Sequence, residues 1–484
     1  MMVGMSMICR GERRARGEDA MGASNLQVGA TSVRVGETHR GAHNDNDSAS
    51  GGPRPQNECK APSLRLNFYW TVFGNVVYAG CQWAMLMVVA KLGTPELVGR
   101  FALGLAISAP VVTFAACQLR IVQATDATGD YGFSDYLSAR LTGLVPAMLL
   151  IFGISMFSHY SMSTASVIIA IGIAKAFESI SDIYYGLSQQ HERMDLVSKS
   201  KMMKGVFSLG ALGVGMYITR DVFWGSVGLA ITWAIMLFLY DVPNGTRLLR
   251  RSSTGTPSGD VKRAVRPHLH WRTIGKLMWF AIPLGFAGLL NSLRTNIPRY
   301  YVESYLGEAN LGLFSAVAYL MVAVLAVVYA IGECAAPRLG RYYVSKNVSG
   351  FASLLTKLVG LAMLSGAAGV VVSMVAGRQI LSVLFTPEYA KGADILVLVM
   401  VATGVTAVAA ILNYAMTATR SISVQMPLFG LVCVVTAAVC VCCIPTMGLR
   451  GAAFALIAGA ITHLACSGAV VARALYATRH ESNR

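Results

Sequence analysis

Long apolar segments separated by short polar ones make up the chain from Asn67 onward. Each has about the 17 to 25 residues that an α-helix needs to cross the hydrocarbon core of a bilayer. The predicted spans are 69–91, 96–118, 139–159, 164–187, 201–218, 222–241, 275–297, 310–332, 352–376, 393–417, 425–444 and 450–472. The pattern therefore predicts an all-α integral membrane protein with about twelve transmembrane helices.

Polar stretches divide this chain into five parts. Residues 1–66 are rich in Gly, Ser, Asn and Arg, and we expect them to form a disordered cytoplasmic tail. We expect one six-helix bundle over 67–242, a basic cytoplasmic linker over 243–272 and a second six-helix bundle over 273–475. A short cytoplasmic tail, 476–484, ends the chain.

The composition agrees with a membrane protein. Hydrophobic residues make up 55% of the chain and charged residues only 13%, against about 25% charged residues in a typical soluble domain. This excludes an ordinary water-soluble enzyme. The net charge of +16 is then a signal of topology, so we expect no nucleic-acid partner.

The distribution of Lys and Arg predicts the orientation. Of the 40 basic residues, 31 fall on the side of the N-terminal tail and seven on the other side. This count places Arg140, Lys201 and Lys204 with the loops and leaves Lys175 and Arg294 inside spans. Because basic loops stay on the cytoplasmic side, both termini are predicted to be cytoplasmic.

The sequence contains no recognisable catalytic or metal-binding motif. Its ten cysteines are scattered, and none has the paired spacing of a zinc site. Walker A, HExxH and GxSxG sequences are also missing. We therefore expect a protein without cofactors that is not an enzyme.

The two halves resemble each other between their first and second spans. Leu92-Gly93, followed by Gly99-Arg100-Phe101, matches Leu306-Gly307, followed by Gly312-Leu313-Phe314. Since each half has an even number of spans, the two copies must be parallel, as in carriers that rock two bundles about a central site. The pattern predicts a carrier built as a parallel repeat.

Two groups of polar residues fall inside predicted spans, where an ionised group costs at least about 2.5 to 3.5 kcal/mol. Lys175, Glu178 and Asp182 share one face of the fourth span, and Asn291 and Arg294 lie in the seventh. Arg294, with Asn291 beside it, and Lys175 are candidate ligands for an anionic headgroup. Glu178 or Asp182 could take a coupling ion. The alternative is that Lys175 and Glu178 only neutralise each other.

Three further residues are weaker candidates. Arg120 and Arg338 lie near the cytoplasmic ends of the second and eighth spans, where they either anchor the helices or line the mouth of a substrate path. We therefore include both as candidate substrate-binding residues. His463 is alone in the twelfth span, where a packing role is favoured over a role as a proton relay.

Two loop motifs carry a family resemblance. The connection after the second span reads Leu119-Arg120-Ile121-Val122-Gln123-Ala124-Thr125-Asp126, then Tyr131-Gly132-Phe133, Tyr136 and Arg140, and Phe385-Thr386-Pro387-Glu388-Tyr389 precedes the tenth span. Over about residues 64–475 the chain resembles the bacterial polysaccharide biosynthesis and export membrane proteins. These are flippases for lipid-linked oligosaccharides, in the superfamily shared with the multidrug and toxin extruders.

This resemblance implies a V-shaped pair of six-helix bundles around a cationic cavity in the bacterial inner membrane. The implied activity moves an undecaprenyl-pyrophosphate-linked glycan between leaflets by ion-coupled alternating access, for exopolysaccharide, capsule or O-antigen synthesis. Membrane lipids, a polysaccharide polymerase and glycosyltransferases are the implied partners. Two alternatives stay open, a multidrug or cation antiporter of the extruder branch and a membrane-bound glycan polymerase or ligase.

Overall fold

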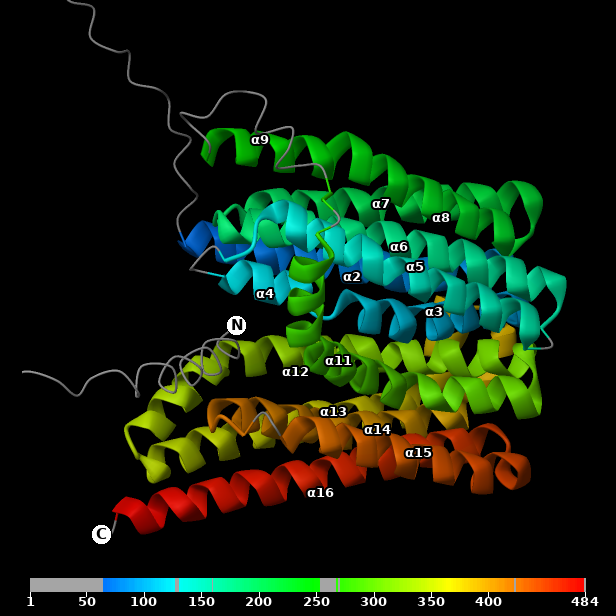
Figure 1. Cartoon of the computed structure of the whole chain (residues 1–484). Coiled ribbons are helices and arrows are strands. Elements are labelled where there is room, and N and C mark those ends of the chain that lie inside the picture. Colours follow the sequence, from blue (N-terminus) through cyan, green and yellow to red (C-terminus); the bar gives the residue numbers. More distant parts are fainter. Residues whose placement is uncertain are drawn as a thin grey trace, which may run out of the picture.

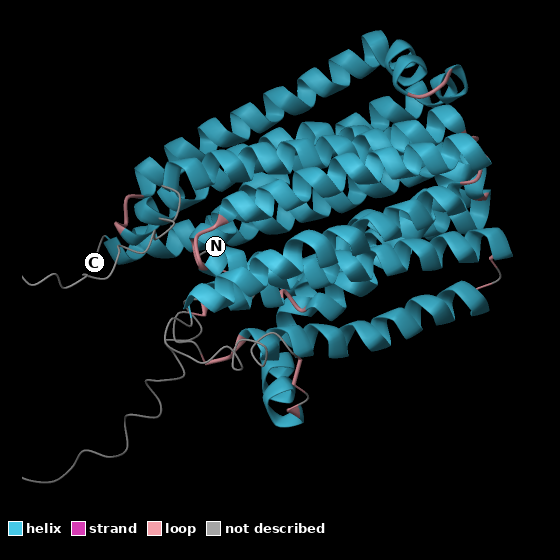
Figure 2. Ribbon diagram, turned by 90° about the horizontal axis from the view of Figure 1, so that it is seen from above, coloured by secondary structure: helices cyan, strands magenta, loops and turns pink. Residues whose placement is uncertain are grey.

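The computed structural model describes residues 64–126, 130–158, 160–252, 267–268, 270–421 and 424–482. Within these ranges the chain forms helices and no strands (Figure 2). Residues 1–63 of the predicted tail and residues 253–266 and 269 of the predicted linker lie outside the described residues, whereas residues 64–66 belong to the first described helix.

The described residues of the first half form eight α-helices and a π-helical turn before the longer gap. They are α2 (Leu64–Leu92), α3 (Pro95–Ala116), α4 (Leu119–Thr125), α5 (Phe133–Phe157), α6 (Met162–Gln190), α7 (Met194–Thr219), α8 (Val222–Met236), η1 (Leu237–Asp241) and α9 (Val242–Ser252). The last three run on from one another without a loop, so the sixth span continues as a helix into the predicted linker.

The second half has longer helices. They are α11 (Trp271–Leu306), α12 (Glu308–Val344), α13 (Val348–Leu384), the 3₁₀ turn η2 (Pro387–Gly392), α14 (Ala393–Ala418), α15 (Gln425–Met447) and α16 (Leu449–Ser482). In the part of the chain that the structure describes, twelve helical stretches are long and apolar enough to cross a membrane. The predicted number of spans is confirmed.

Helices begin earlier than the hydrophobic pattern suggested. Arg140 lies well inside α5, and Lys201 and Lys204 lie well inside α7, so assigning these three residues to loops was wrong. The apolar window ends where polar residues become frequent, whereas a helix continues as long as its backbone hydrogen bonds and side-chain packing allow.

The helices form two lobes that lie side by side (Figure 1). The N-lobe consists of α2 to α9, and the C-lobe consists of α12 to α16 together with most of α11. Helix α11 joins them, because it packs against α3 and α5 of the N-lobe and also against α12, α15 and α16. The start of α2 and the end of α16 lie at the same end of the molecule, which we call the terminal end, and the opposite end is the far end.

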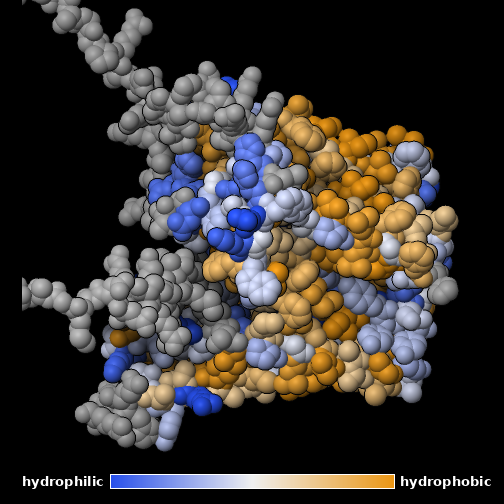
Figure 3. Space-filling view, viewed as in Figure 1, coloured by the Kyte–Doolittle hydropathy of each residue, from blue (hydrophilic) through white to orange (hydrophobic). Residues whose placement is uncertain are grey.

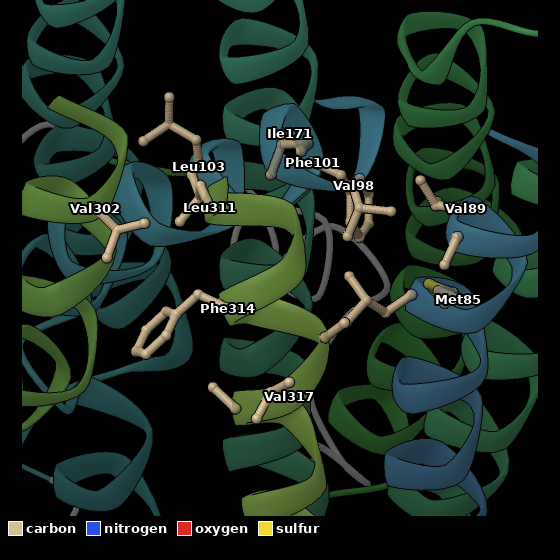
Figure 4. Packing of buried hydrophobic residues seen from close by; sticks show 14 of the residues in the cluster. Met85, Val89, Val98, Phe101, Leu103, Ile171, Val302, Leu311, Phe314 and Val317 are labelled. Atoms are coloured by element: carbon tan, nitrogen blue, oxygen red, sulfur yellow. The ribbon is translucent and has the colours of Figure 1, made fainter. Parts of the chain in front are cut away.

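The hydrophobic core is shared at the far end and divided at the terminal end. One cluster of buried residues combines Phe101 and Leu103 of α3 with Leu311 and Phe314 of α12 (Figure 4). Toward the terminal end, one separate cluster holds α12 to α16 and another holds the N-lobe helices with the first turns of α11. The two lobes are therefore packed together at the far end and have independent cores at the other.

The outer surface is suited to lipid. Hydrophobic side chains form a broad band across the middle of both lobes, and hydrophilic side chains gather toward the end at which α9 lies (Figure 3). Large apolar residues such as Trp279, Leu239 and Val375 are more than 70% exposed. Soluble proteins rarely expose contiguous apolar surface of this extent, so the chain is a multi-pass membrane protein.

Two glycines at equivalent positions of the halves make the lobe contact at the far end possible. A Cβ atom on Gly99 would overlap the carbonyl oxygen of Glu308, and one on Gly312 would overlap that of Pro95. Pro95 and Glu308 are the first residues of α3 and α12. The glycine of each helix therefore meets the first residue of the equivalent helix in the other half. Only glycine allows the two backbones to approach this closely.

Polar contacts reinforce this junction. Arg100 of α3 forms an ion pair with Glu308 of α12, with 2.7 Å between Nε and Oε2. The hydroxyl of Thr164 on α6 donates to the other carboxylate oxygen of Glu308. The hydroxyl of Tyr300 on α11 donates to the carbonyl of Ala106 on α3. The far end is therefore closed by hydrogen bonds as well as by apolar packing.

We expect Gly99→Ala and Gly312→Ala each to weaken the junction by about 1 to 3 kcal/mol, because the added methyl group overlaps a carbonyl of the other lobe. The apparent melting temperature of the purified protein in detergent should fall. Gly210→Ala in α7 is the matched control, since its Cβ would meet nothing within 4 Å. Equal melting temperatures for Gly99→Ala and Gly210→Ala would contradict the close crossing.

Candidate functional site

The predicted charged face of the fourth span lies inside the N-lobe, on α6. Lys175 donates to Glu178 with 2.8 Å between Nζ and Oε2, and its ammonium lies 5.2 Å from the ring centre of Trp233 on α8. The hydroxyl of Tyr78 on α2 donates to the other oxygen of Glu178 at 2.6 Å. Lys175 and Glu178 therefore form an ion pair, and Tyr78 binds this pair from α2.

Asp182 holds two arginines from different helices. Its carboxylate lies 3.2 Å from Arg120 of α4 and 3.4 Å from Arg140 of α5. The chain bends between α3 and α4 because Cys117 and Gln118 both adopt a left-handed backbone conformation, with φ of 46° and 53°. This uncommon pair of non-glycine residues with positive φ turns α4 so that Arg120 packs against α6.

The most buried ion pair described in the N-lobe was missed by the sequence analysis. Lys204 of α7 and Asp241 of η1 lie 2.8 Å apart, and both side chains are only 2% exposed. Lys204 also donates to the hydroxyl of Tyr185, and Ser200 donates to Asp241. A π-helical turn, of the kind that often marks functional positions, ends at Asp241. The available signal was the presence of a lysine and an aspartate inside consecutive apolar spans.

These pairs form one assembly, which we call the N-lobe charge cluster. Its members are Tyr78, Arg120, Arg140, Lys175, Glu178, Asp182, Tyr185, Lys204 and Asp241. Tyr185 links its parts, because the guanidinium of Arg120 and the ammonium of Lys204 lie 5.6 and 5.0 Å from its ring centre. Four cations face three carboxylates, and Lys201, bound to Asn75, lies nearby. The cluster therefore has a positive formal charge.

The cluster is partly accessible. The side chains of Glu178 and Asp182 are 30% and 32% exposed, and that of Lys175 is 21% exposed. Ionised groups in a membrane span avoid lipid and face protein or a water-filled space. The exposed side of the cluster is therefore suited to a polar cavity.

Arg294 forms a second cationic position, in the C-lobe. Its Nε donates to Oδ1 of Asn291 at 3.0 Å, and its guanidinium lies 5.6 Å from the ring centre of Phe429 on α15. Among the described residues no carboxylate lies within ion-pair distance of it. At 1.5 Å per residue, Arg294 and Lys175 lie about 18 and about 20 Å from the far ends of their helices. Each lobe therefore places a cation at a similar depth.

The structure keeps the remaining candidate apart from these groups. Arg338 lies near the terminal end of α12, where it contacts the hydroxyl of Tyr342 at 3.1 Å. It lines a cavity of about 420 Å³ between α12 and α13, with Cys334, Leu354 and Leu358. The structure thus joins Lys175 with Glu178, Arg120 with Asp182, and Arg294 with Asn291.

Metal binding has no support in the described part of the chain. No group of three His, Cys, Asp or Glu side chains there could hold a metal ion, and the described cysteines are free. Arg294 without a carboxylate and a cluster with excess positive charge can instead bind an anion, because guanidinium groups hold phosphate oxygens through paired hydrogen bonds.

Breaking the buried Lys204 and Asp241 pair should destabilise the protein strongly. Lys204→Met or Asp241→Asn leaves one charged group buried without its partner, at a cost of about 3 to 5 kcal/mol. We expect a large drop in the melting temperature for either single variant. The double variant Lys204→Met/Asp241→Leu should recover most of the loss, and a double variant as unstable as both changes added together would argue against direct pairing.

The comparison with known families and curated proteins gives two results. The profile of the polysaccharide biosynthesis protein family matches residues 64–343. A capsular polysaccharide biosynthesis protein of Staphylococcus aureus, CapF, is 26% identical over 337 residues, which cover 69% of this chain and 80% of that protein.

Solved structures support the fold alone. A multidrug-resistance MATE-family transporter of the MOP superfamily in an inward-facing conformation matches with a TM-score of 0.69 at 10% identity, over 85% of this chain and 99% of that one. An outward-facing conformation of such a transporter matches with a TM-score of 0.56 at 14% identity, over 86% and 96%. A MOP-superfamily transporter from Pyrococcus furiosus also gives 0.56 at 14% identity, over 86% and 96%. The chain thus has the fold of MOP-superfamily transporters.

Proposed function

Because the chain belongs to the polysaccharide biosynthesis protein family, we propose that it is a flippase, which moves a lipid-linked oligosaccharide repeat unit across the bacterial inner membrane. Both termini would be cytoplasmic, which agrees with the position of the start of α2 and the end of α16 at one end of the molecule (Figure 1). The product would serve exopolysaccharide, capsule or O-antigen synthesis. No covalent bond would be made or broken.

The observation that carries this proposal is the guanidinium of Arg294, which binds Asn291 and forms no ion pair within the described part of the chain. A buried or half-buried cation without a carboxylate is costly in a membrane span, and an anionic ligand removes that cost. A pyrophosphate group offers planar sets of oxygens to which a guanidinium can donate twice. We propose that Arg294 and Asn291 bind the pyrophosphate, while the isoprenoid chain stays in lipid.

The N-lobe charge cluster supports the same anionic ligand. Lys175 and Arg120 would provide further cations, and Glu178 and Asp182 would control them, since each carboxylate holds one of these cations in an ion pair. Protonation of Glu178 would release Lys175, and protonation of Asp182 would release Arg120. This gives a route by which an ion gradient could change the affinity for the substrate.

Alternating access requires the shared far-end core to separate and the terminal end to close. In this structure the lobes are joined at the far end by the glycine crossing and the Arg100 and Glu308 ion pair. The terminal end, where the cores are separate, would then be the side on which the substrate enters. Arg338 lies at that end, where it could contact the substrate on entry.

The alternative of a cation antiporter has less support. A cavity for cationic drugs needs a carboxylate that is free to bind them. Glu178, Asp182 and Asp241 are all ion-paired, and the cations of the cluster outnumber its carboxylates. The charge of the cluster therefore favours an anionic substrate.

We expect Arg294→Ala to abolish export of the polymer, and Arg294→Lys to restore it only in part because an ammonium cannot donate in the paired geometry. Mass spectrometry of the membrane lipids should show that a complete pyrophosphate-linked repeat unit accumulates. The control is Arg378→Ala, which removes an exposed arginine near the far end of α13.

Normal polymer export by Arg294→Ala, at a protein level equal to that of the wild type, would contradict the proposal. Unchanged lipid intermediates together with increased sensitivity to cationic drugs would favour the antiporter instead.

A further inference from the structure

His463 of α16 is buried in the C-lobe without a hydrogen-bond partner. His463 is 2% exposed, and neither of its ring nitrogens has a hydrogen-bond partner among the described residues. Ser467, one helical turn further along the same face, is fully buried, and its hydroxyl also lacks a partner. A neutral imidazole carries one donor and one acceptor, and buried groups of this kind are nearly always paired. The position therefore calls for a functional explanation.

The surroundings of His463 connect it to Arg294. The rings of His463 and Phe429 pack edge to face, with their centres 5.5 Å apart. The guanidinium of Arg294 lies 5.6 Å from the same Phe429 ring centre. The guanidinium and the imidazole are therefore at most about 11 Å apart, which is the sum of these two distances. Phe429 therefore contacts two groups that can both carry positive charge.

The other helices that pack against α16 add no carboxylate near this position. α16 contacts α11, α13, α14 and α15. α15 contains no charged residue, the single carboxylate of α14 is Asp394 at the far end of that helix, and the charges of α13 are Lys357 and Arg378. The charged residues of α11 are Arg272, Lys276, Arg294, Arg299 and Glu303, and Glu303 lies near the far end of that helix. α16 itself carries Arg450 and Arg473, and the uncharged titratable groups include Tyr414 of α14 and the cysteines of α15 and α16. Arg294 lies near His463 because both side chains contact the ring of Phe429.

We propose that His463 is a proton-binding site linked to the occupancy of Arg294 by an anion. This inference rests on the proposed function and assigns the coupling of that function to a proton bound by His463. While Arg294 is unoccupied, burial of His463 and the charge of Arg294 both oppose a positive charge on the imidazole. When an anion binds Arg294, the second opposition is removed and His463 takes a proton from the solvent onto its free ring nitrogen more readily. No other bond is formed or broken.

The linkage is reciprocal, because a proton on His463 must favour the anion as much as the anion favours the proton. At a separation of about 11 Å and an effective dielectric constant of about 20, the interaction corresponds to roughly a tenfold change in an equilibrium constant. His463 differs here from Glu178 and Asp182, whose ion pairs already satisfy their charges. Among the described residues, His463 is the histidine that lies inside a predicted span of the C-lobe.

The test is calorimetric titration of the purified full chain in detergent with inorganic pyrophosphate. Titrations in buffers of different ionisation enthalpy give the number of protons taken up on binding. We expect the wild type to take up more protons per pyrophosphate than His463→Gln at pH 4.5, by a fraction of one proton, and its affinity to rise severalfold more than that of the variant between pH 7.5 and 4.5, because burial keeps the imidazole neutral near pH 7. Protonation of pyrophosphate itself contributes equally to both proteins.

Two further variants serve as a control and as a replacement for His463→Gln. Ser467→Ala removes the neighbouring unpartnered hydroxyl and should take up protons as the wild type does. His463→Met fills the same space without a titratable group and replaces His463→Gln if that variant does not fold. Equal proton uptake and equal pH dependence in the wild type and the His463 variant would overturn the inference, while Arg294-dependent binding would leave the proposed function intact. Pyrophosphate binding that is unchanged in Arg294→Gln would instead overturn the proposed function.

Discussion

The absence of water from the hydrocarbon core is the constraint on which this structure depends. Every backbone polar group must be paired within its own segment, so the spans can only be helices. Every charged side chain must find a partner or a polar space, because lipid offers neither. Among the described residues, the buried cations of the N-lobe charge cluster form ion pairs, whereas Arg294 of the C-lobe forms none. That contrast is the main reason to connect the C-lobe with an anionic ligand.

The same constraint explains how the lobes are joined. In a membrane, helices gain little from the hydrophobic effect and associate through close packing and hydrogen bonds. The far-end junction uses both, since the crossing at Gly99 and Gly312 brings two backbones together and Glu308 binds Arg100 and Thr164. A junction made of one glycine crossing and a few polar contacts can be separated as a unit. This property is what a carrier with two alternating openings needs.

The two lobes share an architecture and differ in chemistry. The repeated glycine motif lies at equivalent positions of α3 and α12, but the charges of α6 have no counterpart in α14, whose interior is apolar except for threonines and Asn413. A substrate between the lobes would meet a charge network on one side and, on the other, the guanidinium of Arg294, which forms no ion pair among the described residues. A repeat whose halves have specialised in this way can hold a pyrophosphate on one wall and control affinity from the other.

The sequence by itself determined the class of the protein, the number of spans and the parallel repeat. The length of each apolar segment and the spacing of its glycines are local properties of the sequence, and the thickness of the bilayer sets the length that a span needs. The sequence also identified Arg294, Lys175, Glu178 and Asp182, since charges within apolar runs are visible without a structure. Only the tertiary structure decided which charges meet. Lys204 and Asp241 belong to different helices, and Arg140 reaches Asp182 only because α5 packs beside α6. Pairing across helices depends on helix rotation and packing, which no stretch of a single span contains.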